Sequence, residues 1–373
     1  MLCNDPLRFI QNYFSGFSKN EFLEKGSDWM EQSFFKELIH YNKPKESPFR
    51  LLGAGLCMIS VLFTGYLTHQ LAISSFGSLG IFTFLYYQRL PLKQLIMRLS
   101  IVGSFLTVAN FLGMLSTHAA WTAPIVVAIV GFLGRFFFRL YGIAKPGPFF
   151  IVMVTAMGAS TKIPLTRIPV MSGYFFIGVL FSLLVATILH FVENKPLPAI
   201  EARKTVKSRI DDDPAVVIDS LLYSGFLFFA VYLSMSLQLK NPYWLVVSCA
   251  SILQADNLRA MAHRNVQRIF GTIIGLAIAA FLLYLPLSVF ETLLIITVLF
   301  VTVEYFVKRN YAIAQFFTTP MALMLSMLVR QQYLYSLIQF RFLGIVLGSL
   351  LGLLAGWLMS TSLEFYNRKF HSN

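Results

Sequence analysis

The sequence predicts an all-α polytopic membrane protein with about 12 transmembrane helices. Hydrophobic residues make up 57% of its 373 residues and charged residues only 13%, and the mean hydropathy is +0.68. This composition excludes a soluble globular protein. A helix needs about 20 apolar residues to cross the bilayer core, so 12 spans would use about 240 residues and leave little for a separate soluble domain.

The charge balance supports the same class. The 30 Lys and Arg residues outnumber the 17 Asp and Glu residues, and the formal net charge is +13. In a soluble protein this surplus would suggest a nucleic-acid partner, whereas in a membrane protein it gathers in cytoplasmic loops. We therefore expect the lipid bilayer as a partner and no nucleic acid.

Residues 1–48 form a polar segment with apolar residues at helical spacing. These residues are Phe9, Tyr13, Phe17, Met30, Phe34 and Leu38. The pattern is typical of amphipathic cytoplasmic helices that either pack beneath the bundle or bind lipid headgroups. Residues 1–30 contain no apolar core of a signal peptide, so the first span is expected to act as an uncleaved signal anchor.

Twelve apolar stretches follow in two groups of six. The first unit, residues 49–192, contains stretches at 49–68, 71–87, 99–117, 119–138, 147–160 and 168–192. The second unit, residues 216–360, contains stretches at 216–238, 243–256, 268–285, 287–307, 311–329 and 341–360. Some are short or charged, notably 119–138, 147–160 and 243–256. Short or broken spans are tolerated only where neighbouring protein or a wet cavity satisfies the freed backbone groups.

A charged cytoplasmic linker, residues 193–215, joins the two units, and a tail, residues 361–373, ends the chain. In the linker, Asp213 before Pro214 predicts an N-cap for the next helix. With six spans in each unit, both termini and the linker lie on one side, together with 25 of the 30 Lys and Arg residues. The positive-inside rule therefore predicts cytoplasmic termini.

The chain resembles itself when shifted by 170 residues. The shift pairs Arg89 with Arg259, Arg98 with Arg268, Arg139 with Arg309, Ser78 with Ser248 and Gly178 with Gly348. Three arginine pairs on one shift indicate a duplication. Because each unit has an even number of spans, the two repeats share one orientation, with a pseudo-two-fold axis along the membrane normal and a path near their interface.

Basic residues near the cytoplasmic ends of the spans are the candidates for gathering an anionic substrate. They are Arg89, Arg98, Arg139, Arg259, Arg264, Arg268 and Arg309. Guanidinium groups placed symmetrically around an axis would concentrate anions in a vestibule. The alternative is that each arginine snorkels to the headgroups and only fixes the topology.

Small residues predict close helix packing in the second unit. Gly344, Gly348, Gly352 and Gly356 recur at every fourth position, and Gly271, Thr272 and Gly275 form a shorter set. Such faces let helix backbones approach closely. The last spans of the two units are therefore expected to pack against each other or against a neighbouring helix.

One stretch of about 40 residues resembles the fusaric-acid-resistance (FUSC) family. It contains Asn241-Pro242-Tyr243-Trp244, Leu253-Gln254, and then Arg264, Arg268, Gly271, Thr272 and Gly275. This group is similar to bacterial aromatic acid exporters and, more distantly, to plant aluminium-activated malate transporters. The resemblance implies six-helix units that pair around a central path and export small organic anions, aromatic carboxylates among them.

Many relatives of that family carry a sizeable cytoplasmic domain, for which this chain has no room. Either the membrane part is expected to work alone, or an accessory cytoplasmic or envelope protein or a homo-oligomer completes it. Tyr243 and Trp244 would stack an aromatic substrate or belong to the interfacial aromatic belt.

A proton-coupled exporter needs a titratable group that reaches both the path and water. The candidates for coupling or gating are Asp256, His263 and Glu304. Asp256 could pair with Arg259 or Arg268, and Glu304 could instead pair with Lys308 one turn later. No enzyme motif and no His or Cys spacing for a metal occurs, and Cys57 and Cys249 lie in apolar stretches, so we expect no enzyme activity, no metal and no cofactor.

The leading prediction is a bacterial plasma-membrane exporter of small organic anions of the aromatic or amphipathic carboxylate class, with a path between two fused repeats. An anion channel is the nearest alternative, because no coupled ion is evident. A non-transporting scaffold for an envelope-assembly or lipid-handling partner is the alternative from a different class.

Overall fold

The computed structural model describes residues 40–43, 47–119, 121–143, 146–193, 206–328 and 334–370. The chain divides into two compact units, residues 1–42 and residues 43–373, and all the helices below belong to the second. The amphipathic helices predicted within residues 1–48 lie almost entirely outside the described residues. In that range the structure describes only residues 40–43, 47 and 48.

The described residues form helices and contain no strand. The first half comprises α4 (Pro48–Leu67), α5 (Leu71–Gly80), η1 (Ile81–Tyr86), α6 (Leu92–Leu115), η2 (Ser116–His118), α7 (Thr122–Leu140), α8 (Phe149–Gly158), η3 (Leu165–Arg167) and α9 (Ile168–Val192). A short helix, α10 (Val206–Asp212), lies in the linker. The second half comprises α11 (Val216–Ser236), α12 (Tyr243–Ile252), α13 (Leu258–Tyr284), α14 (Val289–Phe306), α15 (Tyr311–Met327) and α16 (Leu334–Phe370).

In the part of the chain that the structure describes, eight helices are long and apolar enough to cross a membrane. Three apolar segments are shorter, namely α5 with η1, α8 and α12. The all-α, multi-pass membrane class is therefore confirmed, whereas the number of about 12 full spans is not.

Two helices begin earlier than their apolar stretches predict. α6 begins at Leu92 and α13 at Leu258, although the apolar stretches begin at 99 and 268. The Asn257 side chain accepts a hydrogen bond of 2.8 Å from the Ala260 amide and caps α13 before its basic first turns. The arginines expected in cytoplasmic turns at 98, 264 and 268 therefore lie within helices.

The helix starts also correct one expectation. Glu291 and Ser288 form a reciprocal capping box at the start of α14. Asp213, by contrast, is not the N-cap of α11, because that position is Ala215 and makes no side-chain cap. The Asp213 carboxylate instead binds Arg139, so the interaction with a guanidinium replaces the expected cap.

Each half packs its sixth helix against its second, with α9 on α5 and α16 on α12. A Cβ atom added at Gly348 would overlap the carbonyl oxygen of Leu245, and one at Gly178 would overlap that of Gly77. Gly344 and Gly352 also lie against α12, whereas Gly356 meets the Met261 side chain. The glycine face of α16 is thus directed at α12 and α13 of its own half, while Gly271 and Gly275 lie against α15.

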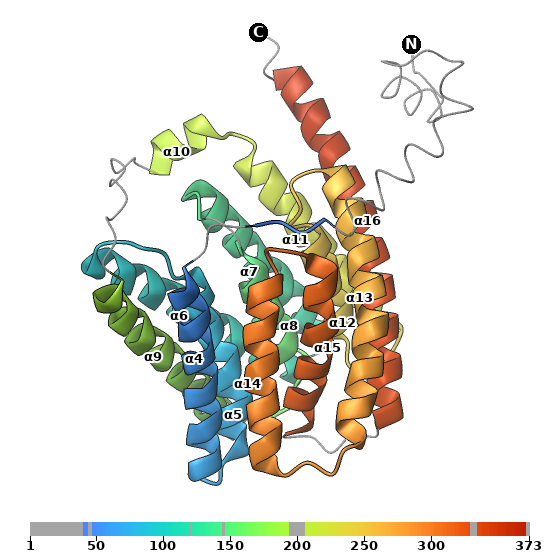
Figure 1. Ribbon diagram of the computed structural model, residues 1–373. Helices are drawn as coiled ribbons and strands as arrows, with labels where there is room; N and C mark the ends of the chain where they lie inside the picture. Colours follow the sequence, from blue (N-terminus) through green and yellow to red (C-terminus); the bar gives the residue numbers. More distant parts are fainter. Residues whose placement is uncertain are drawn as a thin grey trace. The chain divides into compact units, whose positions relative to one another are not determined.

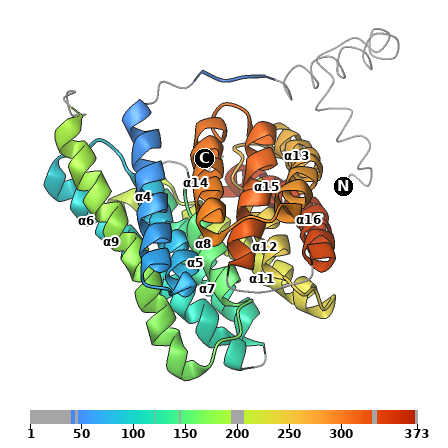
Figure 2. The same cartoon turned by 60° about the horizontal axis from the view of Figure 1, so that its bottom comes forward.

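The two halves meet through three helix pairs. α4 packs against α14, α7 against α11, and α8 against α12, and α4 lies beside α14 in both Figure 1 and Figure 2. One apolar core combines α4, α6 and α9 with residues of α14 and α15. A second core combines α7 and α8 with α11, α12 and α16 and includes Cys249. Large apolar side chains such as Leu184, Phe281 and Val298 remain exposed, as expected of a lipid-facing surface.

Candidate functional site

Two short helices meet at the contact between the halves. α8 and α12 each contain ten residues, which corresponds to about 15 Å, or half of a bilayer core. Pro148 and Pro242 directly precede them, and proline favours a helix start over its continuation. Short helices at this position leave space at both of their ends, and a cavity lies at each end.

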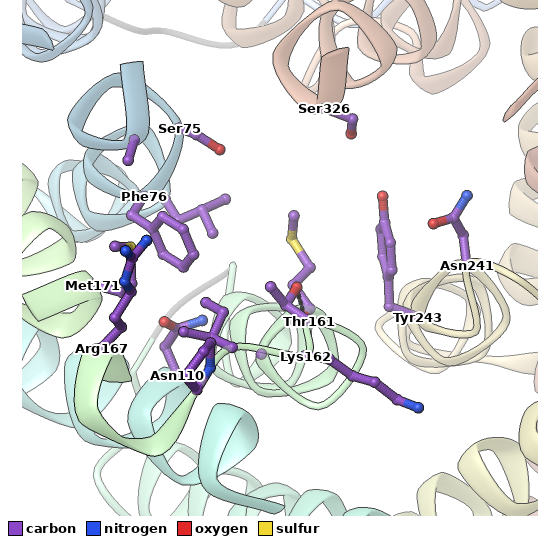
Figure 3. A pocket seen from close by; sticks show the side chains of 16 residues that line it. Ser75, Phe76, Asn110, Thr161, Lys162, Arg167, Met171, Asn241, Tyr243 and Ser326 are labelled. Carbon is purple, nitrogen blue, oxygen red and sulfur yellow. Dashed lines mark hydrogen bonds between the residues drawn. The ribbon is translucent and has the colours of Figure 1, made fainter. Parts of the chain in front are cut away.

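Cavity A lies beyond the end of α8 and the start of α12 and has a volume of about 370 Å³. Both halves line it: Phe76 and Met171 come from the first half, and Tyr243 and Ser326 come from the second. Figure 3 shows the Tyr243 and Ser326 hydroxyl groups directed into the same space. A cavity with aromatic walls and a few converging polar groups is typical of a small-molecule site.

Two basic residues, Lys162 and Arg167, also belong to the wall of cavity A. Figure 3 shows the Lys162 side chain extending away from the space between Tyr243 and Ser326. Neither residue forms an ion pair with an acid within the described ranges. Their charges therefore give the wall of cavity A a positive potential.

Cavity B lies at the opposite ends of the same two helices and has a volume of about 350 Å³. Its wall includes Arg135 and Arg139 of α7, the Pro146–Pro148 segment before α8, and Gln254 and Asp256 after α12. The Gln254 amide donates a hydrogen bond of 2.8 Å to the Pro146 carbonyl oxygen and ties the two halves together there.

Two carboxylates compensate the arginines of cavity B. Arg135 Nε lies 2.7 Å from Asp219 Oδ2, and Arg139 Nη1 lies 2.9 Å from the same oxygen. Arg139 Nε also lies 2.5 Å from Asp213 Oδ2. The Asp219 side chain is only 3% exposed, against 36% for Asp213. This network joins α7 to α11. Of the seven predicted arginines, only Arg139 belongs to the wall of cavity A or B.

Arg89 and Arg98 lie in the first half and bind neighbouring polar groups. Arg89 Nε lies 3.2 Å from Glu193 Oε2, and Arg98 donates a hydrogen bond of 2.7 Å to Gln88. The Tyr87 hydroxyl donates to the same Glu193 carboxylate at 3.1 Å. Burial and the nearby Glu193 carboxylate raise the pKa of Tyr87 to about 12, so its hydroxyl remains a proton donor.

Arg264 and Arg268 come together around Tyr311 in the second half. Arg268 donates to the Tyr311 hydroxyl at 2.7 Å and to the hydroxyls of Ser248 and Ser251 at 3.2 Å. The Arg264 guanidinium lies 4.4 Å from the centre of the Tyr311 ring. These contacts hold the first turns of α13 against α12 and α15.

The remaining predicted residues are dispersed. Arg259 and Asp256 are exposed, and Arg309, in the turn after α14, stacks on Tyr305 of that helix at 3.8 Å. His263 and Glu304 are half-buried and line neither cavity A nor cavity B. Thr272 is fully buried on α13. In the described part of the chain, no group of three or more His, Cys, Asp or Glu residues could hold a metal ion.

Sequence reasoning missed the arginine most deeply buried in the described residues. The apolar pattern placed Arg341 at the edge of the last span, but α16 begins at Leu334, and Arg341 is 1% exposed. Its guanidinium lies 3.7 Å from the centre of the Trp244 ring. The Asn-Pro-Tyr-Trp motif thus supplies Tyr243 to cavity A and Trp244 to a buried arginine.

Comparison with known proteins shows what the second half is similar to. Residues 227–355 match the family described as fusaric acid resistance protein-like. An uncharacterized membrane protein of Bacillus subtilis (strain 168), YvaC, is 29% identical over 121 residues, which is 32% of this chain and 19% of that protein. The match therefore covers about a fifth of that relative's length. No solved structure matches the chain. The protein is a multi-pass membrane protein whose second half, from α11 to α16, contains a fusaric acid resistance-like segment.

Proposed function

We propose that this protein exports small organic anions, aromatic carboxylates among them, across a bacterial plasma membrane along a path between its two halves. The observation that carries the proposal is the pair of opposed cavities, A and B, which are both lined by both halves and separated by α8 and α12. Substrate sites in transporters commonly lie at the interface between repeats.

The chemistry of the cavity walls suits an anion with an apolar body. Cavity A offers Phe76 and Tyr243 to an aromatic ring, and the positive potential from Lys162 and Arg167 in its wall would attract a carboxylate. Positive potential in a low-dielectric cleft raises the local concentration of anions. Cavity B, at the end with the cluster of arginines, would be the cytoplasmic entrance, and cavity A would be the exit.

Between the cavities the contact of α8 with α12 is closed by apolar side chains. Val152 and Ala156 of α8 share one buried core with Val246 and Cys249 of α12. An apolar closure between two cavities favours alternating access over a permanently open anion channel. An anion channel remains the alternative within transport if these side chains move apart without a change in the arrangement of the halves.

The order and packing of the helices support the proposed duplication. α4 begins at Pro48 and α11 at Val216, while α9 begins at Ile168 and α16 at Leu334. Each pair of helix starts is therefore separated by about 170 residues, which matches the shift in the sequence. Two of the three contacts between halves are also reciprocal, because the first helix of each half packs on the fourth helix of the other. This reciprocity is what a pseudo-two-fold axis between parallel repeats requires.

The coupling group and the partners belong to the proposal as well. Asp256 lines cavity B and is exposed, so it is the acid among the predicted candidates that can exchange protons with water at the path. The protein would act without enzyme chemistry or a cofactor, with cytoplasmic termini, either alone, as a homo-oligomer or with an accessory cytoplasmic or envelope protein. The scaffold alternative predicts no flux at all.

Blocking each cavity in purified protein tests the path. Ser326→Trp would fill cavity A, and Ala255→Trp would fill cavity B. Gly225→Trp is the matched control, because a Cβ at this exposed glycine of α11 meets no atom within 4 Å. Uptake of radiolabelled benzoate and its ring-substituted analogues into proteoliposomes, with and without a pH gradient, is the measurement.

We expect both cavity variants to lose at least about 90% of the wild-type flux and the Gly225 variant to keep it. Flux that persists in both cavity variants would contradict a path between the halves. Wild-type accumulation against the benzoate gradient supports a coupled exporter, whereas strictly downhill movement supports the channel. Wild-type protein with no flux for any tested anion would favour the scaffold.

The predicted role of the arginines in gathering anions can be tested at Arg259, separately from the cavities. Arg259 is exposed, and reversing its charge should disturb the fold little. If Arg259 gathers anions, Arg259→Glu should raise the KM for benzoate with little effect on kcat, because it would lower the local anion concentration. Unchanged kinetics would assign Arg259 to membrane topology instead.

A further inference from the structure

The second half contains a fully buried arginine with unsatisfied donors. Arg341 is 1% exposed, and its Nε and Nη1 groups have no hydrogen-bond partner. Its remaining polar contact is a long one, 3.4 Å from Nη2 to the Thr319 hydroxyl. The guanidinium also lies 3.7 Å from the centre of the Trp244 ring. An aromatic ring interacts favourably with a cation, but it does not neutralise its charge.

A second buried arginine acts on the first. Arg268 is 4% exposed, and its positive charge repels the positive charge of Arg341. Its hydrogen-bond partners are the hydroxyl groups of Ser248, Ser251 and Tyr311. Among the described residues, no carboxylate forms an ion pair with Arg268 or Arg341.

Two buried guanidinium groups without a carboxylate are energetically costly. A buried charge is tolerated when it is paired and its hydrogen bonds are satisfied, and the cost is larger inside a membrane protein. The contact between α7 and α11 shows a compensated arrangement, because Asp219 binds both Arg135 and Arg139 and Asp213 binds Arg139. The unpartnered donors of Arg341 therefore indicate an absent counter-charge that comes from outside the chain.

The surroundings limit the size of that counter-charge. Arg341 lines neither cavity A nor cavity B, so it is separate from the proposed substrate cavities. Thr272, on α13, which packs against α16, is fully buried, and its hydroxyl also has no hydrogen-bond partner. Because Arg341 is buried among packed helices and lines neither cavity, we infer that the counter-charge is a single compact ion and not an organic acid with a ring.

We propose that Arg341, supported by the charge of Arg268, binds one small monovalent inorganic anion of the chloride class within the second half. The guanidinium Nε and Nη1 groups of Arg341 would donate to the ion, and the Thr319 hydroxyl is the neighbouring polar group. This site goes beyond the proposed transport function, because it holds a resident ion and does not require that any substrate be transported.

Trp244 provides a reporter for this ion. Replacing Trp29, Trp121 and Trp357 by Phe in the full-length protein leaves Trp244 as the single tryptophan. Bromide quenches indole fluorescence, and it can be titrated in detergent at constant ionic strength against gluconate. We expect saturable quenching that chloride reverses, because both halides compete for the same position beside the Trp244 ring. Quenching that rises linearly with bromide and ignores chloride would overturn the proposal without any further variant.

Two variants locate the ion. Arg341→Gln in the single-tryptophan protein should weaken bromide binding by about tenfold or more, because it removes the charged donor group. Arg167→Gln, at the wall of cavity A, is the matched control and should leave the bromide titration unchanged. If Arg341→Gln does not fold, Arg341→Lys, which retains the charge but loses the two free guanidinium donors, should still weaken binding.

A carboxylate arm separates this site from the substrate path. Benzoate at concentrations that saturate transport should not displace bromide from Trp244. Displacement by benzoate with no competition from chloride would overturn the proposal and would assign Arg341 to the organic substrate. The bromide titration does not depend on transport, because it is measured by Trp244 fluorescence in detergent. A missing anion site can therefore be distinguished from a missing transport function.

Discussion

The two outer helix pairs that join the halves have corresponding positions but different chemistry. α4 meets α14 through apolar contacts, such as the edge-to-face pair of Phe63 and Phe290 with ring centres 6.0 Å apart. α7 meets α11 through Arg135 and Asp219, 2.7 Å apart, beside cavity B. An apolar contact can slide without leaving a charge unpaired, whereas an ion-paired contact cannot. The comparison assigns the fixed contact to α7 and α11 and the adaptable one to α4 and α14.

The interiors of the halves differ in the same way. In the first half, Arg98 is half-buried and bound to Gln88, and Met171 occupies the position 170 residues before Arg341. In the second half, Arg268 and Arg341 are both buried. The proposed duplication would thus give two similar frames, with buried arginines of this kind in the second one.

Breaking the ion-paired contact should have the largest effect. Asp219→Asn leaves Arg135 and Arg139 beside a neutral amide, and removing one partner of a buried ion pair costs about 3–5 kcal/mol. Asp213→Asn should cost about 1 kcal/mol or less, because Asp213 is a third exposed and solvent screens the pair. Reversible unfolding in SDS and lipid mixed micelles measures both changes. Equal losses for the two variants would contradict the fixed role of the α7 and α11 contact.

Adding a Cβ atom where the sixth helix of each half packs on the second should have the next largest effect on the free energy of unfolding. The loss should be similar in both halves. Gly348→Ala and Gly178→Ala each place a Cβ against a backbone carbonyl oxygen that cannot move aside, which costs about 1–3 kcal/mol. Gly225→Ala and Gly173→Ala meet no atom within 4 Å and should be neutral or slightly stabilising. Thermal unfolding of the four variants checks this. A tolerant Gly178 beside a sensitive Gly348 would show that the halves pack differently.

A smaller effect should separate the adaptable contact from the fixed one. A Cβ at Gly55 of α4 would lie 2.8 Å from a methyl group of Val301, and one at Gly131 of α7 would lie 2.5 Å from a methyl group of Leu227. In both cases a side chain can give way, so each Gly→Ala change should cost about 1 kcal/mol or less. We expect Gly55→Ala to cost less than Gly131→Ala, because α4 and α14 carry no ion pair that fixes their spacing. The opposite order in the same unfolding assay would argue against the comparison.

The last effect concerns Tyr87 and is absent at neutral pH, because it appears only above pH 10. The pKa of Tyr87 is raised to about 12 in the folded protein, against about 10 for an ordinary tyrosine. The folded state holds the proton more tightly, so its stabilising contribution is complete below pH 10 and is lost as the pH rises towards 12. Tyr87→Phe should flatten the dependence of the unfolding free energy on pH between 10 and 12. An unchanged slope would show that Glu193 does not hold the Tyr87 proton.

The apolar pattern predicted helix positions well, because lipid and core both select apolar side chains. The first span was expected at 49–68 and α4 covers Pro48–Leu67, and the expected 168–192 span is α9. The pattern failed where polar residues are helical, as at the start of α13, whose cap at Asn257 precedes a basic turn. Hydropathy marks the part of a helix that lies in the bilayer, not the helix end.

The candidate site was predictable in its motif and not in its geometry. The Asn-Pro-Tyr-Trp run predicted aromatic residues near a path, and Tyr243 does line cavity A. The burial of Arg341 depends on the packing of α16 against Trp244 of α12, which no local pattern reports. The pairing of Arg139 with Asp213 was missed for the same reason, since Asp213 before Pro214 also fits a helix cap.

The central claim is that cavities A and B open to opposite sides of the membrane and form one substrate path. Ser326→Cys in cavity A and Ala255→Cys in cavity B can be introduced after Cys3→Ser, with Cys57 and Cys249 retained because they are buried. A membrane-impermeant thiol reagent is then applied to each side of sealed vesicles of known orientation. The account predicts that the residue-255 cysteine reacts only from the cytoplasmic side, that the residue-326 cysteine reacts only from the opposite side, and that benzoate protects both. Reaction of both from one side, or no protection of either, would contradict it.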